Sequence, residues 1–205
     1  MDGLTKFDKF IQDINDNRVT SISLSGINIS KKKAVVISSA LSKNSTLTSL
    51  QLIRDYIGGE ATAIISSALT KNTTLTYLDI SMNQFNNDGA VDISTALSKN
   101  STLTSLNISL NFIRNEGAVA ISSALSKNST LTSLDISYNR MFIQDEYYEE
   151  IEYYEEIKKY MERNQKISKI TRNHSLQWKC ADVIKDNRID CSAIPPIIRD
   201  QFGLK

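Results

Sequence analysis

A 28-residue period constrains this chain more than any other feature of its sequence. The stretch from Leu103 to Thr130 reads LTSLNISLNFIRNEGAVAISSALSKNST. Closely similar text begins at Leu47, Leu75 and Leu131, and looser text begins at Val19. Five copies in phase indicate a solenoid, because one such unit cannot bury its own apolar face and must stack on its neighbours.

The first half of each copy predicts a strand and a turn. Leu103, Leu106 and Ile108 lie at strand spacing and are expected to point into the stack. Asn111 follows, where its side-chain amide can bond the backbone of neighbouring coils. The same position holds asparagine in two other coils and departs from it in the first two: Asn83, Asn139, Asp55 and Ile27. We therefore expect an asparagine ladder toward the C-terminal side only.

The second half of each copy predicts a helix. Residues 116–127 place Ala118, Ile121 and Leu125 at helical spacing, so these three should be buried. Asn128 is suited to a left-handed cap at the C-terminal end of that helix.

Two copies carry the text of a known family. Residues 79–83 read DISMN and residues 135–139 read DISYN, which resembles the core motif of leucine-rich repeats of the ribonuclease-inhibitor type over about residues 19–170. The resemblance implies an α/β solenoid with a parallel sheet on the concave face, helices on the convex face and a helical cap at each end. It divides the chain into an N-terminal capping helix (1–18), a solenoid of about five coils (19–170) and a C-terminal segment (171–205).

The two ends of the solenoid depart from the period. At the N-terminus, Leu4, Phe7, Ile11 and Ile14 fall on one face of a predicted helix over residues 2–17, which would cover the open end of the stack. The fifth coil is eight residues longer than the others, and its extra length falls in a stretch that holds the tandem hexapeptide EYYEEI (146–151 and 152–157). We interpret it as a longer final helix or as an acidic arm for a basic partner.

The alignment continues beyond the insertion. Ile157 aligns with Ile121, and residues 161–164 align with 125–128. Ile167 and Ile170 then predict the start of a sixth strand.

The concave face is the candidate binding surface. Strand positions that point away from the core are mostly small and polar, but the last column changes in every coil. Variable residues in an otherwise copied unit are where a partner would be recognised. The predicted partner-binding residues are Arg54, Tyr77, Asp79, Met82, Leu110, Asp135 and Tyr138.

The C-terminal segment carries a second resemblance. Residues 175–184 read SLQWKCADVI, which resembles an elongin-binding box, and Ile194-Pro195 with Ile198 and Phe202 resembles a cullin box of the von Hippel–Lindau or suppressor-of-cytokine-signalling type. The resemblance implies that Leu176 and Cys180, in the box that ends at Ile184, enter a pocket on elongin C, that Ile194, Pro195 and Ile198 face a cullin, and that these proteins with elongin B form a ubiquitin ligase. Two alternatives stay open: a plain helical cap with the same apolar spacing, and a poxvirus-like F-box tail suggested by IPPIIRDQF.

Catalysis finds little support in the composition. One histidine excludes most histidine-based catalytic pairs and any multi-histidine metal site. No phosphate-binding glycine loop is present, so we expect no enzyme, no cofactor and no metal. A net charge of +1 and the lack of a long apolar run argue against nucleic-acid and membrane partners.

We therefore expect a non-enzymatic scaffold that binds a protein on its concave face. The sharper hypothesis is the substrate receptor of an elongin–cullin ligase, and the alternative is a plain leucine-rich repeat module or a delivered effector. No secretory signal is visible and the two cysteines do not suggest a disulfide framework, so we expect a cytoplasmic location, or the host cytosol for an effector.

Overall fold

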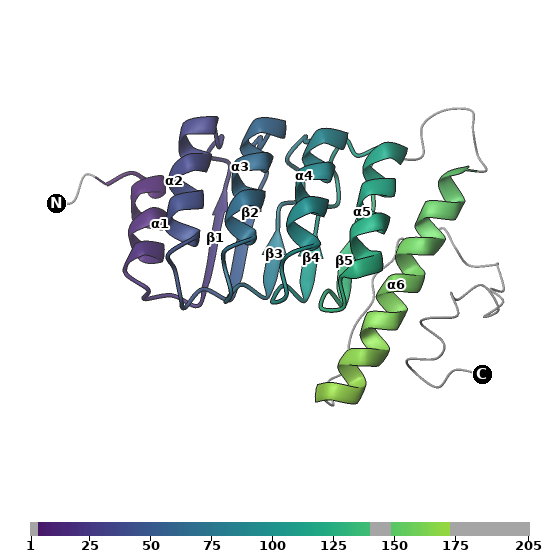
Figure 1. The fold of residues 1–205 in the computed structure, drawn as a ribbon. Helices are drawn as coiled ribbons and strands as arrows, with labels where there is room; N and C mark the ends of the chain where they lie inside the picture. The colour runs from purple at the N-terminus through teal and green to yellow at the C-terminus, as the bar shows by residue number, and fades with distance from the viewer. Residues whose placement is uncertain (1–3, 140–148, 173–205) are drawn as a thin grey trace.

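Five parallel strands alternate with helices in a computed structural model of the chain, which describes residues 4–139 and 149–172 (Figure 1). In the last helix, side chains are described from Glu155 to Lys166. The elements in order are α1 Lys6–Asn15, β1 Ser21–Ser25, α2 Lys31–Leu41, β2 Ser49–Ile53, α3 Gly59–Leu69, β3 Tyr77–Asp79, α4 Asn87–Leu97, β4 Ser105–Asn107, α5 Asn115–Lys127, β5 Ser133–Asp135 and α6 Glu149–Arg172.

The strands form one sheet in the order β1-β2-β3-β4-β5, with α2 to α5 stacked side by side on one face of it (Figure 1). Every neighbouring pair is parallel and in register at a separation of 28 residues, as in Leu50↔Leu78 and Leu78↔Leu106. The chain is thus an α/β leucine-rich repeat solenoid, as the period predicts. Each strand begins two residues after its expected start.

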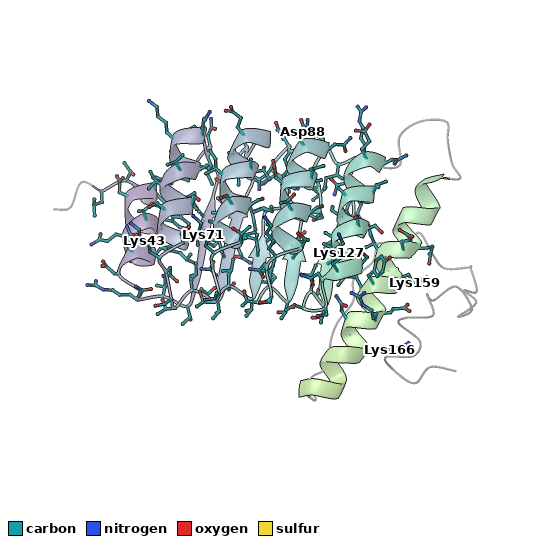
Figure 2. The ribbon with its side chains drawn as sticks, in the orientation of Figure 1. Lys43, Lys71, Asp88, Lys127, Lys159 and Lys166 are labelled. Carbon is teal, nitrogen blue, oxygen red and sulfur yellow. The ribbon has the colours of Figure 1, made fainter. Side chains whose placement is uncertain are left out.

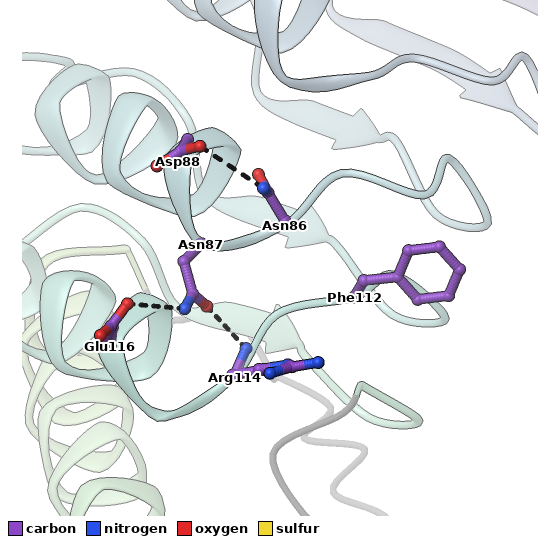
Figure 3. A pocket seen from close by; sticks show the side chains of 6 residues that line it. All are labelled: Asn86, Asn87, Asp88, Phe112, Arg114 and Glu116. Atoms are coloured by element: carbon purple, nitrogen blue, oxygen red, sulfur yellow. Dashed lines mark hydrogen bonds between the residues drawn. The ribbon is translucent and has the colours of Figure 1, made fainter.

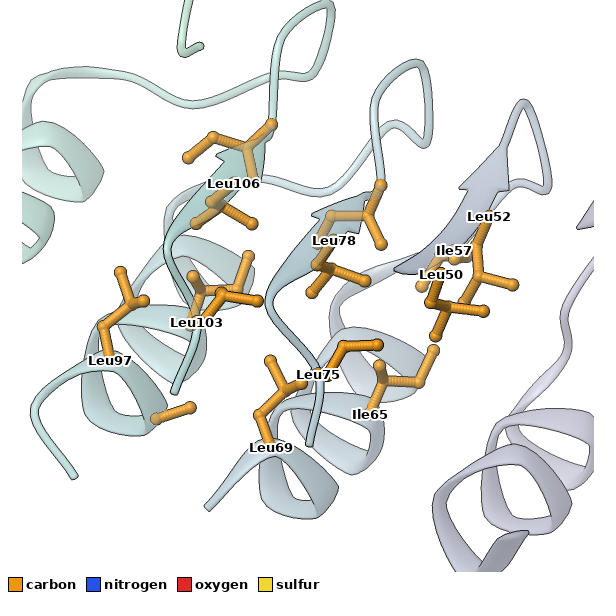
Figure 4. Close-up of a cluster of buried hydrophobic side chains, with 14 of the residues drawn as sticks. Leu50, Leu52, Ile57, Ile65, Leu69, Leu75, Leu78, Leu97, Leu103 and Leu106 are labelled. Carbon is orange, nitrogen blue, oxygen red and sulfur yellow. The ribbon is translucent and has the colours of Figure 1, made fainter. Parts of the chain in front are cut away.

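The core lies between the sheet and the helices. Each coil contributes leucines from its strand and an isoleucine and a leucine from its helix, and these side chains interdigitate with those of the next coil (Figure 4). In the fourth coil, Ala118, Ile121 and Leu125 are all buried, which confirms the predicted inward face of α5. Removing one large side chain therefore leaves a hole shared between two coils.

One asparagine ladder holds the strand-to-helix turns. Asn83 donates its Nδ2 to the carbonyls of Leu52 and Ser81 at 2.6 and 3.0 Å, and its Oδ1 accepts from the Asp55 N–H at 2.8 Å. Asn111 repeats this pattern one coil later. The ladder extends further toward the N-terminus than predicted, because Asp55 Oδ1 accepts from the Ile27 N–H at 2.7 Å.

A second ladder holds the helix-to-strand turns, and it corrects one prediction. Asn128 has φ −87° and ψ 123°, so it is extended and does not form a left-handed cap. Its Nδ2 donates to the Leu97 and Asn100 carbonyls of the preceding coil. Its Oδ1 accepts from the backbone N–H groups of Thr130 and Leu131, and these bonds turn the chain into β5. Equivalent residues in earlier coils are Asn44, Asn72 and Asn100.

The N-terminal helix covers the first coil but is shorter than predicted. Thr5 caps α1 in a capping box with Asp8, in which each side chain bonds the other's backbone N–H at 3.0–3.1 Å. The helix therefore begins after Thr5, and Leu4 lies outside it and is 54% exposed. Ile14 is buried as predicted, and Phe10 is buried beside it.

The last helix, α6, packs against α5 and closes the other end (Figure 1). Ile157 and Met161 are buried as the alignment with Ile121 and Leu125 predicts. Asn164 donates to the Asn128 and Leu131 carbonyls, and the Arg163 guanidinium donates to the Leu125 carbonyl.

The predicted sixth strand is wrong, because α6 continues through residues 167–172. In the coil before, Asn128 Oδ1 accepts from backbone N–H groups and turns the chain. Asn164 Oδ1 accepts from the Arg163 side chain instead, so no turn forms and the helix runs on.

Candidate functional site

The strands present one surface away from the helices, and its columns lie in the predicted register. One column is Ser21, Ser49, Tyr77, Ser105 and Ser133, and the next is Ser23, Gln51, Asp79, Asn107 and Asp135. Small polar side chains dominate both columns. Tyr77 is the one large aromatic side chain within them, and the other large side chains of this face stand beyond the strand ends.

Asp79 is buried, against the expectation that it would contact a partner. It is 5% exposed, and its carboxylate accepts hydrogen bonds from the Tyr77 hydroxyl, the Asn107 amide and the Ser81 N–H at 3.3, 3.1 and 2.9 Å. Burial, followed by the neighbouring Asp79 charge, raises the pKa of Tyr77. Asp79 therefore holds neighbouring groups of the sheet together. Asp135, which takes the same position two coils later, is partly exposed.

One large residue lies just beyond the end of each of the strands β2 to β5, and these residues form a line across the coils. We call it the strand-end ridge and define it as Arg54, Met82, Leu110 and Tyr138, one residue per coil. Arg54, Leu110 and Tyr138 are exposed, and Tyr138 reaches 72%. Because the four differ in charge, size and aromaticity while their surroundings repeat, the ridge is the part of this face that is particular to each coil.

Every ridge residue has a left-handed backbone. The φ angles are +60° at Arg54, +60° at Met82, +55° at Leu110 and +54° at Tyr138, and Gly26 takes the same place in the first coil at +73°. Glycine or asparagine adopts this region at little cost, whereas other residues do so at about 1–2 kcal/mol. Such strain kept at one repeated position is typical of functional surfaces.

A second row flanks the ridge and was missed by sequence reasoning. It consists of Tyr56, Gln84 and Phe112, each two residues beyond a ridge residue; Tyr56 and Gln84 also have positive φ. Tyr56 is 61% exposed, and Phe112 is exposed as well. The same 28-residue alignment would have found this row, but the prediction considered only residues within the strands.

A shallow pocket lies beside Phe112, at the starts of α4 and α5 (Figure 3). Its volume is about 310 Å³, and Asn87 bridges its wall by donating to Glu116 and accepting from the Arg114 N–H at 2.9 and 2.8 Å. Asn86 donates to Asp88 across the opening. These bonds join the starts of α4 and α5, so the pocket is part of the packing between neighbouring coils.

Lysines mark the opposite edge of the solenoid from Asp88 (Figure 2). One lies at the C-terminal end of each of α2 to α5, at the same place in the repeat: Lys43, Lys71, Lys99 and Lys127. Cations are favoured at helix C-termini, so this row stabilises the helices. Lys31 pairs with Glu60 at 3.1 Å, which accounts for one member of the lysine run 31–33 as a surface ion pair.

The geometry above belongs to a recognisable domain. A family model described as the TMOD/LMOD leucine-rich domain matches residues 63–185, more than half of the 205-residue chain. The chain belongs to this family. The match begins in α3 and runs through the last three coils and α6.

Two solved structures share the fold of this TMOD/LMOD leucine-rich domain. The structure of leiomodin-1 actin-binding site 2 is 20% identical, with a TM-score of 0.72, and the alignment covers 83% of this chain and 96% of that one. The C-terminal domain of tropomodulin from Caenorhabditis elegans is 13% identical, with a TM-score of 0.69, and the alignment covers 82% and 99%. No curated protein matches the sequence significantly.

The elongin- and cullin-box residues lie outside the described part of the structure, from Leu176 to Phe202. The match to the TMOD/LMOD leucine-rich domain extends across Ser175–Ile184, where the elongin-like text stands. The comparisons therefore support a leucine-rich repeat protein and give the ligase interpretation no support.

Residues 4–139 and 149–172 hold no group of three or more histidine, cysteine or acidic side chains arranged to bind a metal ion. Within the same residues, no helix has the length and apolar character needed to cross a bilayer.

Proposed function

We propose that this TMOD/LMOD leucine-rich domain is a non-enzymatic protein-binding module whose partner docks on the strand-end ridge. One observation carries the proposal: four successive coils hold a different large residue at φ between +54° and +60°, where glycine or asparagine would cost less. The turn of the repeat sets this backbone in every coil, Gly26 included. Protein recognition accounts for the large side chains that stand there in place of glycine.

The chemistry of the ridge suits a protein partner. Leu110, Tyr138 and the flanking Tyr56 are large, exposed and partly aromatic, and aromatic and arginine side chains carry most of the energy in protein interfaces. Arg54 supplies a positive charge at one end. Soluble domains rarely expose such a patch without a partner.

Actin is the partner that we propose to test first. The support is the likeness to a solved domain of leiomodin-1 that is named as an actin-binding site, over 83% of this chain. The ridge, and not a catalytic group, would make the contact.

The test is binding of purified monomeric actin, measured by calorimetry with a matched set of variants. Leu110→Ser and Tyr138→Ala should each weaken binding about tenfold or more, because both remove large exposed side chains from the ridge. Val91→Ala is the control: Val91 is 47% exposed on the helical face of the solenoid, so this change should leave binding intact. Ridge variants that bind like the wild type would remove the ridge from the proposal, and a wild type that does not bind would remove actin.

The elongin–cullin role stays a prediction from residues 175–202 alone. Coexpression with elongin B and elongin C tests it directly. Co-purification that is lost in Leu176→Ala would support a ligase receptor. Failure to co-purify would leave the alternative, a plain repeat module.

A further inference from the structure

We propose that the strand-end ridge takes an amphipathic helix of the partner, lying across the coils, with an acidic residue where it meets Arg54. This inference rests on the proposed function and specifies which kind of partner element fits the ridge. Three observations carry it: the spacing of the ridge, its second row and its charge.

The ridge repeats at the spacing of a sheet. The backbone N–H groups of Arg54, Met82 and Leu110 donate to carbonyls of the following coil at 3.4, 3.1 and 3.0 Å. Neighbouring coils are therefore still held together at this position as they are in the sheet, about 4.8 Å apart. Four ridge residues span three such intervals, or about 14 Å.

An α-helix matches this spacing better than an extended peptide. One helical turn advances about 5.4 Å, so three turns cover about 16 Å and place one apolar side chain over each coil. Same-face residues of an extended strand lie about 6.6 Å apart and cover about 20 Å in three steps, so they fall out of phase with the coils. Side chains can absorb the roughly 2 Å difference of the helix but not the roughly 6 Å difference of the strand.

The second row makes the ridge wide enough for a helix. Tyr56, Gln84 and Phe112 run beside it in the same repeat, so the surface is two side chains broad. A helix that presents apolar residues at i, i+4, i+7 and i+11 offers a stripe of comparable width.

The charge at one end of the ridge determines which way the partner helix lies along it. Arg54 is exposed, and no ion pair of its guanidinium occurs among residues 4–139 and 149–172. The other end of the ridge, at Leu110 and Tyr138, is apolar or aromatic. A helix with a glutamate over Arg54 and leucines over Met82, Leu110 and Tyr138 complements both ends.

The test uses a designed helical peptide as the probe. It carries glutamate at i and leucine at i+4, i+7 and i+11, is tagged with a fluorophore, and is compared with an isomer of the same composition whose leucines are dispersed around the helix. We expect the first peptide to bind the wild-type chain about tenfold or more tightly than the isomer, by fluorescence anisotropy. Equal affinity for the two peptides would overturn the proposal that the ridge binds an amphipathic helix. An equally tight peptide with a central proline would also overturn it, because proline breaks a helix and leaves an extended chain intact.

A charge swap tests the orientation. Arg54→Glu should weaken binding of the peptide. Replacing the peptide's glutamate with lysine should restore binding to that variant only. Thermal melting of Arg54→Glu confirms that the exposed substitution leaves the fold intact. Absence of restoration would overturn the assigned pairing.

The outcomes separate this inference from the proposed function. If Leu110→Ser and Tyr138→Ala lose actin while the two peptides bind alike, the helix is wrong and the binding ridge stands. If the helical peptide binds at the ridge while wild-type actin binding is absent, the helix stands and actin is the wrong partner.

Discussion

Asp55 Oδ1 accepts a hydrogen bond from the Ile27 N–H at 2.7 Å, whereas its second oxygen, Oδ2, is buried and meets no donor among the described residues. One coil later, Asn83 stands at the same place, and its Nδ2 donates to the Leu52 carbonyl. A carboxylate cannot make that bond unless it is protonated. The ladder thus contains one member that lacks a donor when it is ionised.

Asp55→Asn should stabilise the protein by about 1–3 kcal/mol at pH 7, because it supplies the missing donor and removes a buried charge. Burial, the largest cause, raises the folded-state pKa of Asp55 above 3.8, although the Ile27 N–H, Lys6 and Lys33 act against it. Its contribution to stability is therefore fully present below the unfolded-state pKa and is lost as pH rises through the folded-state pKa. Chemical denaturation should show a larger gain for Asp55→Asn at pH 7 than near pH 4.

The reciprocal change is the control. Asn83→Asp places the same acceptor-only group one coil later, so it should destabilise the protein at pH 7. A gain from Asp55→Asn that is equal at both pH values would show that ionisation of Asp55 plays no part.

Ile121→Ala should lower the free energy of unfolding by about 2–5 kcal/mol, because it leaves a cavity between α5 and the sheet. Val119→Ala, two residues away on the exposed side of the same helix, should change it by less than about 0.5 kcal/mol. Urea denaturation of both variants measures the difference. Similar losses from the two would contradict the assignment of Ile121 to the core.

Gly117→Ala should destabilise the stack by about 1–3 kcal/mol, although alanine is the better helix former. A Cβ at Gly117 would lie 2.6 Å from Ile113 Cγ2 and 2.9 Å from Ala90 Cβ, so α4 and α5 would have to separate. At Gly59 in α3 the nearest atom, Asn86 Oδ1, is 3.7 Å away, so Gly59→Ala should be neutral or slightly stabilising. Thermal melts of the two variants should shift in opposite directions or differ by several degrees.

The sequence predicted what repeats and missed what depends on a single side chain. The period placed all five strands within two residues, because each coil packs on copies of itself. It did not predict that α6 runs on past Asn164, whose oxygen accepts from the Arg163 side chain, whereas the oxygen of Asn128 accepts from the backbone of a turn. The early start expected for α1 is a different error, because Thr5 and Asp8 carry a readable capping signal.

The candidate site was predicted in part for the same reason. Variation at one repeat position pointed to Arg54, Met82, Leu110 and Tyr138, and three of these are exposed on the ridge. Nothing in residues such as leucine or methionine signals a left-handed backbone, so the strain became visible only in three dimensions. The buried Asp79 bonds Tyr77 of its own strand and Asn107 of the neighbouring strand, and the second contact does not show in the text of one coil.

That strain gives the ridge a measurable cost. Leu110→Gly should raise stability by up to about 1 kcal/mol, because glycine takes φ near +55° without a steric penalty and Leu110 is 44% exposed, so little burial is lost. The same change should weaken binding of the partner, because it removes an apolar side chain from the ridge. Leu110→Asn is the companion variant, since asparagine tolerates this region and keeps a side chain. Denaturation midpoints that rise while affinity falls would show that the fold holds Leu110 for binding; a midpoint that falls in both variants would mean that Leu110 serves the packing of its coil.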